Sequence, residues 1–134
     1  PGRACRYRHM YLTLPPELPV PTCHRCRHMV LTYESVPALD ATLKATFRAE
    51  LVLRASVEIT HLSQCYSQRK IERDLDLSQD YLSKLRSGDS VPSVVLVSLL
   101  ALLRSDPSRV EELKGYWALP LTPMPPPCAR KRGP

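Results

Sequence analysis

The sequence predicts a mainly α-helical fold, in which five helices follow a small N-terminal β module. From residue 35 onward, apolar residues recur at helical spacing in five segments, most of which follow a residue that can cap a helix. Before residue 35 the chain is rich in Pro and short of helix signals. With 134 residues, of which 43% are hydrophobic, the chain can bury one modest core plus an appendage.

The N-terminal segment carries two short runs of strand-forming residues, 10–14 and 28–32. The segment between them contains Pro15, Pro16, Pro19 and Pro21. Runs of this kind separated by Pro-rich chain are typical of two strands around a loop.

The first helix is expected to begin at Ser35, which can act as its cap, with Pro37 in the first turn. Every fourth residue then forms one apolar stripe, which consists of Leu39, Leu43, Phe47 and Leu51. The pattern extends to about Leu62, either without interruption or with a break at 57–60, where β-branched residues cluster.

Two short helical patterns follow, 68–75 and 79–86, and three residues separate them. After a turn that begins at Gly88, Ser93 can cap a nearly wholly apolar helix over 94–103. Such a helix is expected to pack against the core over most of its circumference.

The last helix is expected from Asp106, with Pro107 at its first position, to Lys114, where Gly115 ends it. The remainder of the chain, 119–134, is rich in Pro and ends with basic residues, which predicts an extended or disordered tail.

The two short helices form the most specific pattern in the chain. A serine can cap each helix, and apolar residues face inward from both. The caps are Ser67 and Ser78, and the inward-facing residues are Ile71, Leu75, Leu77, Leu82 and Leu85. The run SQRKIERDLDLSQDYLSKLRSGDSVPS resembles, without a gap, the helix-turn-helix of the Xre/Cro family of phage repressors and their relatives. The resemblance implies a lambda-repressor-like fold, double-stranded DNA as a partner and transcriptional regulation; the alternative is a pair of amphipathic helices within an ordinary bundle.

The resemblance also implies which residues contact DNA. They are Gln68, Gln79, Asp80, Ser83, Lys84 and Arg86. Gln68 matches the position that touches a phosphate in the family, whereas the outward positions of the second helix read base edges. A glutamine can pair with adenine, a lysine can donate to guanine and an aspartate can accept from cytosine.

Three positions depart from the family pattern. Glu72 stands where the family has a small residue, so its side chain is expected to extend out of the helix crossing. Asp76 stands in place of a turn glycine, and aspartate tolerates the left-handed conformation. Gly88 is followed by Asp89 and Ser90 rather than by a cation, so this motif alone is expected to bind DNA weakly.

The chain has five cysteines, an odd number spread unevenly, which argues against a disulfide scaffold. Cys23 and Cys26 form a C-x2-C knuckle that suits one tetrahedral zinc ion. The predicted zinc ligands are Cys5, His9, Cys23 and Cys26. His24 and His28 compete for the fourth place, and a degenerate ribbon without metal is the alternative to a structural zinc site.

The order of these segments resembles that of the MqsA-like antitoxins. The residues that carry this resemblance are the Cys23–Cys26 knuckle, Thr32 and Glu34 at the opening of the first helix, and the motif that begins at Ser67. The resemblance implies an autorepressor that dimerises through its C-terminal helices and can bind a toxin partner. The expected dimer contacts are Leu113, Tyr116 and Trp117. The expected divisions are a zinc-ribbon-like module 1–34, a connecting helix 35–64, a helix-turn-helix domain 65–118 and a basic tail 119–134. A protein-interaction module with little specific DNA binding is the competing function.

The formal net charge of +6 favours an anionic partner, but the basic excess lies outside the helix-turn-helix. Five arginines stand in the first 33 residues against a single acid, Glu17. They are Arg3, Arg6, Arg8, Arg25 and Arg27, and we expect them to supply the contacts to DNA phosphates.

Other function classes are not favoured. No apolar run approaches the roughly 20 residues of a membrane-spanning helix, and no leader peptide is evident, so a cytoplasmic protein is expected. His61, Cys65 and Asp74 are the nearest approach to a catalytic set, but nothing in the sequence orders them, so no enzyme activity is expected.

Overall fold

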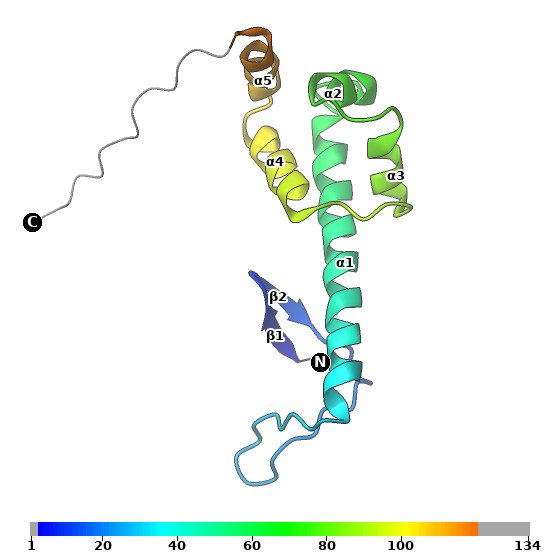
Figure 1. Cartoon of the computed structure of the whole chain (residues 1–134), viewed down its shortest axis with the longest axis vertical. Coiled ribbons are helices and arrows are strands. Elements are labelled where there is room, and N and C mark those ends of the chain that lie inside the picture. The colour runs from blue at the N-terminus through cyan, green and yellow to red at the C-terminus, as the bar shows by residue number, and fades with distance from the viewer. Residues whose placement is uncertain (1–2, 121–134) are drawn as a thin grey trace, which may run out of the picture.

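The computed structural model describes residues 3–120. Within them lie a two-stranded hairpin and five helices, so the mainly α-helical prediction is confirmed (Figure 1). The elements are β1 (Ala4–Tyr7), β2 (Met10–Thr13), α1 (Ser35–Leu62), α2 (Gln68–Asp74), α3 (Tyr81–Ser87), α4 (Val94–Ser105) and α5 (Arg109–Ala118). Nearly all of the predicted tail 119–134 lies outside the described residues.

Helix α1 is the axis of the molecule. Figure 1 shows α2 to α5 gathered around its C-terminal half and the hairpin beside its N-terminal half. The helix runs without the break considered at 57–60, because Ala55, Ile59 and Leu62 continue its buried stripe through that segment. The β-branched Val57 and Thr60 face solvent, and the Thr60 hydroxyl donates to the Ser56 carbonyl oxygen at 2.8 Å.

The start of α1 differs from the prediction. The residue before the helix is Glu34, and it makes no side-chain cap. Ser35 lies inside the helix, where its hydroxyl accepts from the backbone N–H of Thr32 at 2.9 Å. Ser35 therefore closes the turn before α1 instead of capping the helix.

The core lies where the C-terminal half of α1 meets the other helices. Its fully buried large side chains come from all five helices: Ile59, Leu62, Ile71, Leu82, Leu85, Leu100, Leu103 and Val110. Because α1 shares this core with α2 to α5, it belongs to the helical domain, and the boundary expected at residue 64 cuts through one packed unit.

The hairpin packs against the N-terminal half of α1. Met10 and Leu12 of β2 are buried in the same apolar cluster as Phe47 of α1. The ring of Tyr7 meets the Phe47 ring edge-on at 5.5 Å, and the Arg8 guanidinium lies 5.2 Å from the Phe47 ring centroid.

The strand prediction is right for the first run and wrong for the second. Residues 10–13 pair with β1, a strand that the sequence did not indicate. Of the run 28–32, only Met29 forms an isolated bridge, to Thr22. Residues 28–32 are all exposed, so no core surface holds them in an extended ladder.

Helix α4 is capped as predicted, since the Leu96 N–H donates to the Ser93 hydroxyl oxygen at 3.1 Å. Only one side of it is buried, whereas burial over most of its circumference was expected. Its buried residues are Val97, Leu100 and Leu103, while Val95 is 78% exposed. None of the helices in the described residues is both long and apolar enough to cross a bilayer.

Candidate nucleic-acid interface

Helices α2 and α3 are joined by a tight turn whose backbone follows the sequence signals. Ser67 caps α2, because its hydroxyl accepts from the Lys70 N–H at 3.3 Å. Asp76 adopts the left-handed conformation with φ 54°, as predicted for a residue that replaces glycine. Gly88, with φ 86°, ends α3 in the same conformation.

The start of α3 is later than expected. The predicted cap, Ser78, does not cap the helix with its side chain; its carbonyl oxygen accepts from the Tyr81 N–H at 3.1 Å. The residue that precedes the helix is Asp80, which has φ 61° and makes no side-chain cap. Gln79 and Asp80 therefore lie in the turn before α3, not in its first turn.

The carboxylate of Glu72 takes the place of the missing cap. Its two oxygens accept from the backbone N–H groups of Asp80, at 3.3 Å, and Leu82, at 3.0 Å. A carboxylate at this end of a helix is also favoured by the helix dipole. The expectation that Glu72 extends out of the crossing is wrong, because the residue is only 3% exposed and all of its polar atoms have partners. Glu72, a residue of α2, thus fixes the position at which α3 begins.

The predicted DNA-contacting residues fall into two groups. Ser83, Lys84 and Arg86 are exposed on α3; Ser83 and Lys84 lie away from the buried anchors Leu82 and Leu85, whereas Arg86 lies at the edge of the buried side, one turn after Leu82. Such an arrangement lets the outer side of α3 contact a large partner without disturbing the core.

The remaining predicted residues lie beside α3. Gln79 and Asp80 are exposed in the turn. Gln68 is half-buried, and its amide donates to the Glu72 carboxylate at 3.0 Å, so one of its two amide hydrogens is already engaged. The structure therefore brings all six predicted residues to one α2–α3 region, with Gln68 facing partly inward.

An ion-pair group fastens α2 to α5. The Lys70 ammonium lies 2.6 Å from Asp74 and also contacts Glu111 of α5. The hydrogen bond from Lys70 is the main cause that lowers the pKa of the buried Asp74 carboxyl below its usual value. This charge group therefore links α2 to α5.

Asp74 should make stability depend on acid pH. Its folded-state pKa is depressed, so its contribution is complete above the unfolded pKa of about 3.9 and is lost as the pH falls through the folded value. The variant Asp74→Asn should therefore show a flatter fall of unfolding free energy below about pH 4, measured by urea denaturation at several pH values. Lys70→Met should flatten it too, while costing more at pH 7 because it leaves the buried carboxylate with only its longer contact to Arg73, at 3.2 Å. If the unfolding free energy of Asp74→Asn fell with decreasing pH as steeply as that of the wild type, Asp74 would not be the source of the acid dependence.

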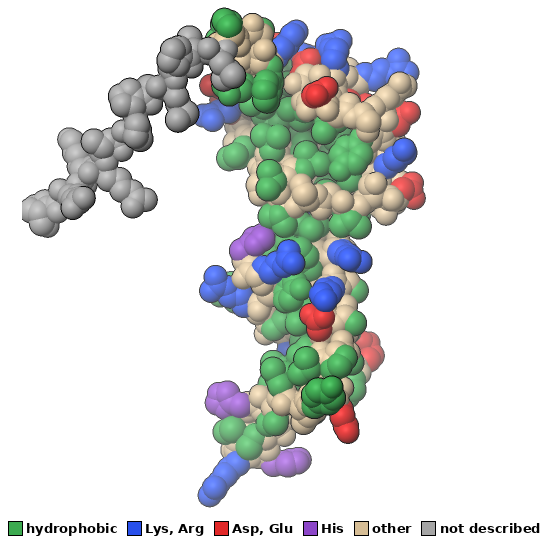
Figure 2. Space-filling view, viewed as in Figure 1, with side chains coloured by type: hydrophobic (Ala, Val, Ile, Leu, Met, Phe, Trp, Pro, Cys, Tyr) green, Lys and Arg blue, Asp and Glu red, His purple; other side chains and the backbone are tan. Residues whose placement is uncertain are grey.

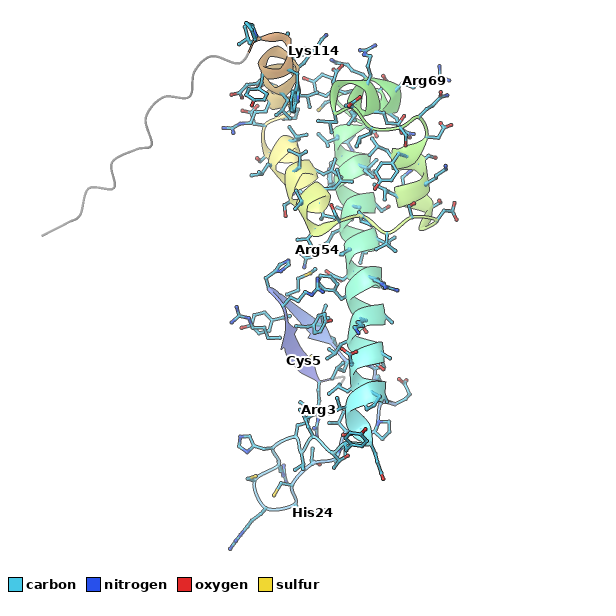
Figure 3. All side chains as sticks on the ribbon, in the orientation of Figure 1. Arg3, Cys5, His24, Arg54, Arg69 and Lys114 are labelled. Atoms are coloured by element: carbon cyan, nitrogen blue, oxygen red, sulfur yellow. The ribbon has the colours of Figure 1, made fainter. Side chains whose placement is uncertain are left out.

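The four predicted zinc ligands lie in two separate places. Cys5 is in β1, half-buried beside the apolar cluster, and this burial raises the pKa of its thiol. His9 is in the hairpin turn with its ring 6.2 Å from the Phe47 ring. Figure 3 shows Cys5 on the sheet beside α1 and His24 in the loop at the far end of the molecule.

Cys23 and Cys26 form a local knuckle in that loop. The Arg27 N–H donates to the Cys23 carbonyl oxygen at 2.8 Å, and the Cys23 N–H donates to the His28 carbonyl oxygen at 2.9 Å. Hydrogen bonds, the strongest of them from the Cys26 backbone, lower the pKa of the half-buried Cys23 thiol. In residues 3–120, however, no three His, Cys, Asp or Glu side chains converge on one metal position. The four-ligand set does not fit a zinc ion in this arrangement, and zinc stays a prediction that metal analysis of the protein can decide.

The N-terminal arginines lie away from α3. Arg3 is beside the N-terminal half of α1 in Figure 3, and Arg8 stacks on Tyr7 and Phe47. Arg48 of α1 lies beside α3, where it lines one groove together with Arg86. Arg69 and Arg73 of α2 line another pocket with Gln79, in the turn before α3. Sequence reasoning missed Arg48 because an arginine on the outer side of a long helix looks like any other solvated charge.

No match was found when the chain was compared with protein-family models and curated proteins, or when its structure was compared with solved structures. The assignment of function therefore depends on the residues of this chain.

Proposed function

We propose that this protein binds double-stranded DNA in a sequence-specific manner and regulates transcription, with α3 lying in the major groove. The observation that carries the proposal is the two-sided character of α3. Leu82 and Leu85 anchor it to the core, whereas Ser83, Lys84 and Arg86 face solvent. A helix whose inner side is anchored to the core and whose outer side carries polar side chains meets the geometric requirement for reading base edges.

The turn before α3 adds to this support. Glu72 holds the backbone of Asp80 and Leu82, so Gln79 and Lys84 project from a fixed frame. Preorganised side chains lose less conformational entropy when they pair with a base edge. We propose Gln79 and Lys84 as the principal reading residues.

A homodimer is part of the proposal. Tyr116 and Trp117, expected at the dimer contact, are 59% and 77% exposed on α5, whereas Leu113 is half-buried. A dimer of this kind should bind a palindrome whose half-sites lie one or two helical turns apart. The toxin partner implied by the antitoxin resemblance remains a further proposal, since exposed apolar residues on α4 and α5 also suit a protein partner.

Selection of DNA fragments from a random pool, followed by sequencing, tests the proposal. On the selected site, Lys84→Ala should cost about 1 to 3 kcal/mol of binding free energy and change the preference at one or two base positions. Gln79→Ala should change the preference at a different position. Arg54→Ala is the control, because Arg54 is an exposed cation on α1, paired with Glu50 and next to the hairpin, away from both α3 and α5. If the pool shows no enrichment, or if Lys84→Ala and Gln79→Ala leave preference and affinity unchanged, the interaction-module function becomes the better one.

A further inference from the structure

A groove lies between α1 and α3, beside the loop that leads to α4. It has a volume of about 480 Å³. Its apolar lining comes from Ala49, Val52, Leu53 and Val91, and Arg48 and Arg86 add the positive charge. Figure 1 shows α3 running alongside α1 here, with the α3–α4 loop crossing α1 below it.

The two arginines are not neutralised by the protein. Both are exposed, and neither makes an ion pair with any residue in the range 3–120. No Asp or Glu lines the groove. The acid in the adjoining loop, Asp89, accepts a hydrogen bond from the Ser87 hydroxyl at 2.6 Å. Two guanidinium groups that share one groove without a carboxylate are suited to an anionic partner.

The groove borders the side of α3 that carries Ser83. Arg86 lies three residues beyond Ser83, so these two side chains are neighbours on the helix surface, whereas Lys84 points to another side. A duplex that α3 enters must therefore carry its sugar-phosphate backbone past this end of the helix. That backbone alternates anionic phosphates with less polar sugars, which matches arginines beside an apolar floor.

Resting on the function proposed above, we infer that Arg48 and Arg86 contact the DNA backbone beside α3 and so hold the reading helix in the major groove. Arg48 supplies from α1 the cation that the loop after Gly88 lacks, since Asp89 and Ser90 follow this glycine. The phosphate contacts thus come from the long first helix and not from the N-terminal arginines.

The salt dependence of DNA binding tests this inference. Affinity of the wild-type protein for its selected fragment is measured by fluorescence anisotropy at several salt concentrations, and the same series is repeated with Arg48→Ala. The slope of log K against log salt should become shallower by about 1. Affinity at 0.1 M salt should fall roughly tenfold, for selected and random fragments alike.

Arg54→Ala is the matched control. Arg54 is an exposed arginine on α1, paired with Glu50 and lining a different pocket, next to the hairpin. It should keep the wild-type slope and affinity, and Arg6→Ala in β1 should do the same. Equal thermal unfolding of the three variants would show that none acts through the fold.

Two results would overturn the inference, and they are distinguishable. If the wild-type protein binds its fragment and Arg48→Ala binds it with the same slope and affinity, the groove does not face DNA and an acidic helix of a protein partner is its better occupant. If the wild-type protein selects no DNA, the proposed function fails and this inference fails with it.

Discussion

Replacing Glu72 with alanine is expected to lower the free energy of unfolding by about 2 to 4 kcal/mol, because buried donors lose a charged acceptor. The variant leaves the N–H groups of Asp80 and Leu82, and the amide of Gln68, without their partner at the α2–α3 crossing. Urea denaturation followed by circular dichroism measures the change. Glu112→Ala is a suitable control, since this glutamate is exposed in the first turn of α5 and should cost less than about 0.5 kcal/mol.

The variant Glu72→Gln separates capping from simple filling of space. Glutamine has nearly the volume of glutamate and keeps one acceptor oxygen, but it replaces the other oxygen with an NH2 group, which cannot accept from a backbone N–H. Glu72→Gln should therefore lower the free energy of unfolding by about half as much as Glu72→Ala. Since the same hydrogen bonds position Gln79, Glu72→Ala should also discriminate less well between bases in DNA, at temperatures where the variant remains folded. An alanine variant as stable as the wild type would show that Glu72 does not cap α3.

Replacing Phe47 with alanine is expected to remove about 3 to 5 kcal/mol of the interaction that docks the hairpin on α1. Phe47 is 7% exposed and contacts Tyr7, Arg8 and His9 of the hairpin. A two-stranded hairpin is at best marginally stable by itself, so β1 and β2 should lose their protection against hydrogen exchange. The helices α2 to α5 should keep theirs, because their core lies at the other half of α1.

Hydrogen exchange resolved by mass spectrometry over residues 4–13 measures this effect. Tyr11→Ala is the control, because Tyr11 is 77% exposed on β2 and its loss should leave the hairpin protected. Retained protection of residues 4–13 in Phe47→Ala would mean that the hairpin is held by contacts other than Phe47.

Features set by contacts within a few residues could be predicted from the sequence. Ser67 and Ser93 cap α2 and α4, because each hydroxyl meets an N–H three residues later. Asp76 and Gly88 adopt the left-handed conformation where the sequence pattern required it. The apolar stripe of α1 likewise predicted a long helix, since its period is a local property of the chain.

Features set by contacts across longer separations could not be predicted in this way. Glu72 reaches N–H groups eight and ten residues away, and only the packing of α2 on α3 brings these groups together. The same holds for Arg48 and Arg86, which share a groove although 38 positions separate them. The run 28–32 has strand-forming residues but no apolar surface that covers it, so β propensity alone predicted a strand that does not form.

The sequence by itself determined five helices, the caps Ser67 and Ser93, and the exposed residues Ser83, Lys84 and Arg86, because periodicity and capping act within one or two helical turns. Only the tertiary structure decided that α3 starts at Tyr81 under the Glu72 carboxylate, and that the hairpin holds Cys5 apart from Cys23 and Cys26. Those outcomes depend on which buried donors and apolar surfaces find partners when distant segments pack. The spacing of residues along the chain does not carry that information.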